Sequence, residues 1–284
     1  MHPWGMRMSR SSRDGMWGGR GQGSPPVRAS VPAVVVIALV VAAALVGVVL
    51  QLGVLSLPAV PVPSASVAEI SVDATTLPLR EVSYTAWDVE ESPEYVRVVG
   101  PAVVDVDIPV GEVWYAPLDA LGRTRRAAGA IDHKTMEAGR ARERGDLHGH
   151  DPSGWGSNAE TDIPLPDGGS YHGFFWNRSH LVAKSLGGSD EVENLVCATR
   201  MENVGANDGK GGMSYAEGMV RAWLSDNPDG WVFYSATPAY EGNELVCRSV
   251  IVDVRSSDGT LDFEAEVYNA ALGHEVDYQT GTFS

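Results

Sequence analysis

The chain has 284 residues, with 37 acidic against 21 basic side chains, so its formal net charge is −16. That charge excludes a nucleic-acid binder that works through bulk positive charge. The composition, 44% hydrophobic and 8% aromatic, is that of a globular protein, and the length suits one domain with appendages.

Residues 31–57 form a long apolar run, and the stretch from Ala33 to Leu50 carries no charge. Such a run is long enough to span a bilayer. Arginines predominate over acids in residues 1–30, so the positive-inside rule places this basic tail in the cytoplasm and the rest of the chain outside. We expect a single-pass membrane anchor; the alternative is a cleaved secretory signal, which would release the protein.

Residues 58–110 are expected to be a stalk and an N-terminal extension. The segment Pro58–Ser66 (PAVPVPSAS) is typical of an extended stalk. Alternating apolar stretches after Ser71 suggest one or two strands. The main domain is predicted over residues 111–284 and begins with a strand at Val113–Tyr115.

The main domain contains strand-like runs on both sides of helical patterns, which indicates the α+β class with a central antiparallel sheet and a helical insert. The expected elements, in chain order, are an irregular basic stretch at 123–150, a Gly/Pro/Asp-rich loop at 151–170, a strand at 173–176, helices around 198–206 and 213–225, and strands at 231–236, 245–254 and 261–268.

Two polar motifs follow the aromatic strand. The strand ends in Asn-Arg-Ser-His, where Arg178 offers an anion-binding fork and His180 a base that works near neutral pH. Downstream, Asn194, Arg200 and Asn203 lie within one run. An asparagine amide oxygen is a hard, neutral ligand suited to Mg²⁺, although Asn203 is equally suited to a helix end or a turn.

Glu217 lies on the predicted helix at 213–225, within the flank of its apolar stripe. That position predicts a carboxylate that faces inward and needs a partner. A capping box is the alternative, in which Ser214 caps the helix and Glu217 returns a hydrogen bond to it.

The motifs NRSH, ENLV, TRMENVG and YAEGMV, in this order, resemble those of the DNA/RNA non-specific endonucleases of the ββα-metal group. The resemblance is strongest to membrane-anchored bacterial DNA-entry nucleases and secreted streptococcal DNases, and it runs from about Leu118 to the chain end. It implies a ββα-metal fold and a sequence-nonspecific endonuclease that hydrolyses DNA outside the cell, with RNA as a further candidate substrate. Mg²⁺ is the implied cofactor and Mn²⁺ the alternative ion.

The resemblance also implies roles for single residues. His180 aligns with the general base that takes a proton from water, and Asn203 with the direct protein ligand of Mg²⁺. Glu217 aligns with the acid that holds the water molecules of the metal. Arg178 matches the motif arginine, which we expect to contact phosphate, and Asn194 an asparagine that orients the active-site backbone.

This chain departs from the usual family motif, Asp-Arg-Gly-His, at Asn177 and Ser179. The family's carboxylate is therefore replaced by a neutral amide. A catalytically inactive surface module that binds nucleic acid is one alternative for this reason, and an exported nuclease toxin is another.

Several arginines could contact the nucleic-acid backbone. We expect Arg200 to contribute to substrate binding, and Arg123, Arg125 and Arg126 either to track the backbone or to form a solvated, charge-balanced surface. The run Gly205–Lys210 is one residue short of a phosphate-binding loop, so no nucleotide cofactor is expected.

Cys197 and Cys247 are the two cysteines of the chain. Outside the cytoplasm they could form a disulfide, and two buried free thiols are the alternative.

Overall fold

The computed structural model describes residues 77–143, 145–207 and 209–284. The expected basic tail, the apolar run at 31–57 and the first part of the stalk lie outside these ranges. No helix within them is both long and apolar enough to cross a membrane.

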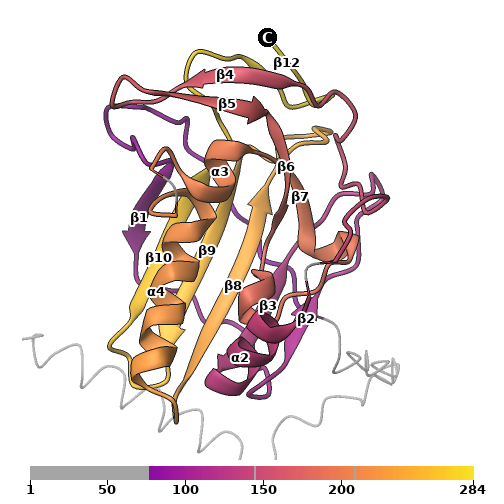
Figure 1. The fold of residues 1–284 in the computed structure, drawn as a ribbon. Coiled ribbons are helices and arrows are strands. Elements are labelled where there is room, and N and C mark those ends of the chain that lie inside the picture. The colour runs from indigo at the N-terminus through magenta and orange to yellow at the C-terminus, as the bar shows by residue number, and fades with distance from the viewer. Residues whose placement is uncertain (1–76, 144, 208) are drawn as a thin grey trace, which may run out of the picture. The chain divides into compact units, whose positions relative to one another are not determined.

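A six-stranded antiparallel sheet forms the centre of the described part of the chain (Figure 1). The strand order is β1-β10-β9-β8-β3-β2, and the prediction of an α+β fold with a central antiparallel sheet is confirmed. The strand bounds are β1 Val96–Gly100, β2 Val113–Tyr115, β3 Ala127–Asp132, β8 Trp231–Ala239, β9 Ser249–Ser256 and β10 Asp262–Tyr268.

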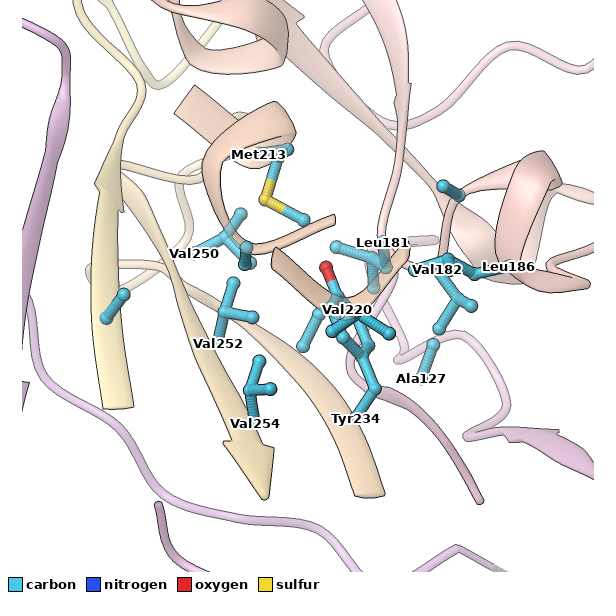
Figure 2. Packing of buried hydrophobic residues seen from close by; sticks show 14 of the residues in the cluster. Ala127, Leu181, Val182, Leu186, Met213, Val220, Tyr234, Val250, Val252 and Val254 are labelled. Atoms are coloured by element: carbon cyan, nitrogen blue, oxygen red, sulfur yellow. The ribbon is translucent and has the colours of Figure 1, made fainter. Parts of the chain in front are cut away.

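One face of the sheet packs against helix α4 (Gly212–Asp226) and helix α2 (His133–Ala141). Alternate side chains of β9, namely Val250, Val252 and Val254, face the buried side of α4, where Met213 and Val220 lie (Figure 2). The predicted apolar stripe of this helix is confirmed, because its buried positions recur at helical spacing.

The opposite face of the sheet carries acidic side chains. Asp253 of β9 and Glu264 of β10 both pair with Arg80, and Glu266 accepts a hydrogen bond from the backbone N–H of Thr85 at 2.6 Å. The segments at 77–85 and 101–109, on either side of β1, therefore lie on this face, where Arg80 compensates carboxylates that the sheet would otherwise bury unpaired.

Three two-stranded sheets complete the described fold. They are β4 (Glu160–Pro164) with β5 (Ser170–Phe174), β6 (Trp176–His180) with β7 (Leu195–Thr199), and β11 (Val276–Asp277) with β12 (Thr282–Phe283). Short 3-10 turns at Lys184–Leu186 (η1) and Val192–Asn194 (η2) connect β6 to β7, and α3 (Arg200–Val204) follows β7.

Several local predictions are corrected. The basic stretch at 123–150 is not irregular, because it contains β3 and α2, whose first turn is capped by Asp132. The loop at 151–170 contains β4, and the strand predicted from 245 begins only at Ser249. The capping-box alternative is wrong: α4 begins at Gly212, and the Ser214 hydroxyl donates to the Asn203 carbonyl at 3.3 Å.

The two cysteines are buried free thiols, so the disulfide alternative is not what the structure shows. The side-chain amide of Asn269 donates to the carbonyls of Cys197 and Cys247, at 3.0 and 2.8 Å. This amide joins the backbones of both cysteines without a covalent bond.

Candidate active site

The hairpin β6–β7 and the two helices after it bring the motif residues to one pocket. His180 ends β6, Asn203 lies in α3 and Glu217 in α4, and all three line a pocket of about 430 Å³ together with Arg178 and Asp190. We call this the His180 pocket. His180 was expected at a strand end of the central sheet; it is at a strand end, but of the separate β6–β7 hairpin.

Asp190 fixes the imidazole of His180. Its Oδ1 lies 2.9 Å from His180 Nε2, and Arg142 Nη2 lies 3.7 Å from the same oxygen. Burial alone would raise the pKa of Asp190, but the hydrogen bond from His180 and the charges of His180, Arg142 and Lys184 outweigh it and lower this pKa. An ionised Asp190 accepts a hydrogen bond from Nε2–H, so the basic lone pair of the neutral ring is on Nδ1.

The sequence motifs did not identify Asp190. The available signal was the tight turn before it, because the glycine pair at 187–188 brings the next residues back toward β6. A Cβ on Gly188 would lie 1.8 Å from the Val182 carbonyl oxygen, so only glycine fits there. Ser189 and Asp190 thereby return beside His180.

Asn194 is fully buried and holds the backbone beside His180 and beside Asp190. Its Oδ1 accepts from the Val182 N–H at 2.9 Å, and its Nδ2 donates to the carbonyls of Val182 and Ser189 at 2.9 and 2.8 Å. The side chain therefore joins the segment after His180 to the segment before Asp190.

Asn203 and Glu217 contribute side-chain oxygen atoms to the same pocket. Asn203 Oδ1 accepts one long hydrogen bond, 3.3 Å, from Ser179 Oγ. Burial raises the pKa of Glu217, and the Arg221 guanidinium, with Nη1 3.3 Å from Oε2, opposes that shift. A neutral amide oxygen and a carboxylate are hard donors, so this pair fits a small divalent cation such as Mg²⁺ that keeps most of its water. The described residues contain no cluster of three or more His, Cys, Asp or Glu side chains that would hold a metal more fully.

Glu202, next to Asn203, is a buried acid that the motifs did not single out. It is fully buried, and neither of its carboxylate oxygens has a hydrogen-bond partner among the described residues. Burial raises the pKa of Glu202 to about 8, the Ser179 hydroxyl opposes this shift, and the nearby Glu217 adds to it. The folded protein therefore keeps a proton on Glu202 at neutral pH.

This proton predicts a pH-dependent stability. The unfolded chain loses the Glu202 proton near pH 4.3, about the ordinary value, whereas the folded chain keeps it up to about pH 8. Between these values the folded state binds more protons, so this residue lowers the free energy of unfolding as pH rises. We expect Glu202→Met to gain stability relative to the wild type as pH rises from 5 to 9, by about 4 kcal/mol over this interval.

Urea titrations of the metal-free protein at both pH values measure this difference. Glu137→Met, which replaces an exposed acid on α2, is the matched control. A stability gain for Glu202→Met that is the same at pH 5 and pH 9 would show that Glu202 is not protonated in the fold.

Arg178 and Arg200 each lie over an aromatic ring beside the His180 pocket. The Arg178 Cζ is 4.0 Å from the ring centroid of Trp155, and the Arg178 Nε donates to Asp151 Oδ1 at 2.9 Å. The Arg200 Cζ is 5.0 Å from the ring centroid of Tyr171. Arg178 and Arg200, the two arginines predicted to contact the substrate, therefore lie close together.

The arginines at 123–126 lie elsewhere and make structural contacts. Arg126 is fully buried and pairs with Asp105 at 2.6 Å, so the expectation that it contacts nucleic acid is corrected. Arg123 pairs with Asp119 at 2.6 Å and donates to two carbonyls, and Arg125 Nε donates to the Pro117 carbonyl at 2.6 Å. None of the three lines the His180 pocket.

The chain is similar to known nucleases. Residues 107–258 match the DNA/RNA non-specific endonuclease family. A deoxyribonuclease of Streptococcus dysgalactiae subsp. equisimilis is 33% identical over 210 residues, which cover 64% of this chain and 63% of that protein. The match thus spans less than two thirds of the length of this relative.

Two solved structures share the fold. The Sda1 nuclease with a bound zinc ion superposes with a TM-score of 0.67 and 31% identity, over 70% of this chain and 99% of that one. NucA from Streptococcus agalactiae, with magnesium bound, has a TM-score of 0.51 and 23% identity, over 66% of this chain and 88% of that one. The fold is therefore that of the ββα nucleases. The chain belongs to the DNA/RNA non-specific endonuclease family.

Proposed function

We propose that this protein is a Mg²⁺-dependent, sequence-nonspecific endonuclease that hydrolyses phosphodiester bonds of DNA. One observation carries the proposal: a histidine held by a carboxylate, an amide oxygen and a second carboxylate line a single pocket with an arginine. The zinc bound in Sda1 and the magnesium bound in NucA support a divalent ion as the cofactor. The apolar run at 31–57 supports an anchor that keeps the domain outside the cytoplasm.

Each residue of the His180 pocket has its own role in the proposed reaction. His180 takes a proton from the attacking water, and Asp190, which accepts from Nε2, stabilises the imidazolium that forms. Arg178 binds the phosphate through its guanidinium. Asn203 would bind the cation directly and Glu217 would hold its water molecules; the bound cation would neutralise the charge that develops on the phosphate and on the leaving 3′ oxygen. None of these groups reads a base edge, so cleavage is expected to be independent of sequence.

A plasmid-nicking assay with the full chain tests this proposal. We expect supercoiled DNA to be cut in Mg²⁺ and in Mn²⁺ and to stay intact in EDTA, and an RNA transcript run in parallel shows whether RNA is also a substrate. A protein that binds the plasmid but does not cut it in either ion would be an inactive binding module, and the proposal would be wrong.

A further inference from the structure

An aromatic groove of about 560 Å³ adjoins the His180 pocket. Leu147, Arg178 and Asn203 line both cavities, so the groove begins at the residues that would hold the scissile phosphate and the cation. Its other walls come from the loop before β4, the strand β5 and the helix α3. A nucleotide strand that places one phosphate in the pocket would therefore pass its next nucleotides into this groove.

Four aromatic residues line the groove, namely Trp155, Tyr171, Phe174 and the buried Trp176, and arginines cover two of them. Arg178 lies on Trp155 and Arg200 on Tyr171, as described above. Phe174 at the end of β5 is 53% exposed, which is unusual for a phenylalanine on a folded domain. Planar guanidinium groups and aromatic rings are the surfaces on which unpaired bases stack.

The strand β5 is shaped to keep the Tyr171 ring in place. A Cβ on Gly173 would lie 2.3 Å from the Tyr171 hydroxyl oxygen. The absence of a side chain at position 173 therefore lets the tyrosine ring lie along its own strand, beneath Arg200. This part of the groove wall therefore depends on Gly173, since any larger residue at this position would displace the tyrosine ring.

The charge of the side chains differs along the groove: it is positive near the His180 pocket, where it favours phosphate, and negative beside Phe174, where it favours an uncharged base. Arg178 and Arg200 supply positive charge near the His180 pocket. Arg178 donates hydrogen bonds to Asp151 through Nε and Nη2, and this contact does not use Nη1. Glu160 is directly opposite Phe174 in the β4–β5 hairpin, so its carboxylate lies on the same face of this sheet as the phenyl ring. A carboxylate there repels a phosphate but tolerates an uncharged base.

We propose that the aromatic groove binds the unpaired nucleotides that flank the scissile phosphate, with a base stacked on Phe174, so that single-stranded nucleic acid is the preferred substrate. In a duplex each base face is covered by its stacked neighbours and cannot reach an aromatic ring. The inference rests on the proposed function for the position of the scissile phosphate. It adds a substrate class to that function.

Binding without cleavage tests the groove independently of catalysis. Fluorescence anisotropy of the full chain in EDTA compares a labelled oligothymidylate, an abasic oligomer of the same length and a duplex. We expect the oligothymidylate to bind about tenfold more tightly than the abasic oligomer, because stacking of one base contributes enough for such a factor. Phe174→Leu should remove most of this difference, and Phe174→Trp should keep it.

Leu79→Ala is the matched control, because Leu79 is 55% exposed on the segment that covers the opposite face of the sheet. It should bind all three probes as the wild type does. Equal affinity of the wild type for the oligothymidylate and the abasic oligomer would overturn the inference, as would an unchanged preference in Phe174→Leu. A protein that shows the expected binding but fails to cut DNA in Mg²⁺ would refute the nuclease function and leave the stacking site standing.

Discussion

Replacing His180 by alanine is expected to reduce the rate of DNA cleavage by about 10²–10⁴-fold, the usual contribution of a positioned general base. The imidazole lies in the pocket with Arg178, Asn203 and Glu217, and its Nε2 is 2.9 Å from Asp190 Oδ1. Removing the ring takes away the proton acceptor while leaving the phosphate- and cation-binding groups in place. Initial rates of plasmid nicking at saturating Mg²⁺ measure the effect.

Two comparisons make this result specific. His133→Ala, at the start of α2 and outside the His180 pocket, should cut DNA at the wild-type rate. Added imidazole should restore part of the activity of His180→Ala, because it supplies the missing base in the space that the side chain leaves. Full activity of His180→Ala with unchanged circular dichroism would refute the role of His180.

Replacing Asn203 by alanine is the second change with a large expected effect. Mutations of groups that only support metal ligands usually cost about 10–100-fold in affinity or activity, so the loss of a direct ligand should cost about 100-fold or more. The substitution removes the proposed direct ligand and leaves only Glu217, which would hold water molecules of the metal; it also removes the acceptor of the Ser179 hydroxyl. Calorimetric titration with Mg²⁺ and the Mg²⁺ dependence of cleavage measure the loss.

The controls for Asn203 separate metal binding from folding. Asn203→Asp keeps an oxygen donor and adds a charge, so we expect it to bind Mg²⁺ at least as well as the wild type. Asn243→Ala, in an exposed turn after β8, should bind Mg²⁺ unchanged. Wild-type Mg²⁺ affinity in a folded Asn203→Ala protein would show that this amide is not a ligand.

Asp190 shows why the site could be predicted only in part. The motif residues were recognisable because each carries the chemistry in its own side chain, and their order along the chain is specific. Asp190 works through a neighbour, and its contact with His180 depends on the turn at Gly187–Gly188 and on the Asn194 hydrogen bonds. No local pattern distinguishes this acid from the neighbouring Glu191.

Dependence on long-range packing also explains why the sequence did not predict the different roles of the three arginines or the strand β3. Arg123, Arg125 and Arg126 look alike in the sequence, but only the packing of the segments at 77–85 and 101–109 on the sheet shows that Arg126 is buried. The strand β3 reads Ala-Ala-Gly-Ala-Ile-Asp, which has little apolar contrast between its two faces, because both are buried. Glycine is required at position 129, where a Cβ would lie 2.9 Å from the Glu112 carbonyl oxygen.

The sequence by itself determined the chemistry of His180 and Asn203, the inward face of the helix around Glu217 and the α+β class, because side-chain type and local periodicity are written in short stretches of chain. Only the tertiary structure decided that Asp190 holds the imidazole, that Glu202 is a buried acid, and that the segments at 77–85 and 101–109 cover the acidic face of the sheet. These features depend on which distant groups share a buried environment, and burial is a property of the packed fold.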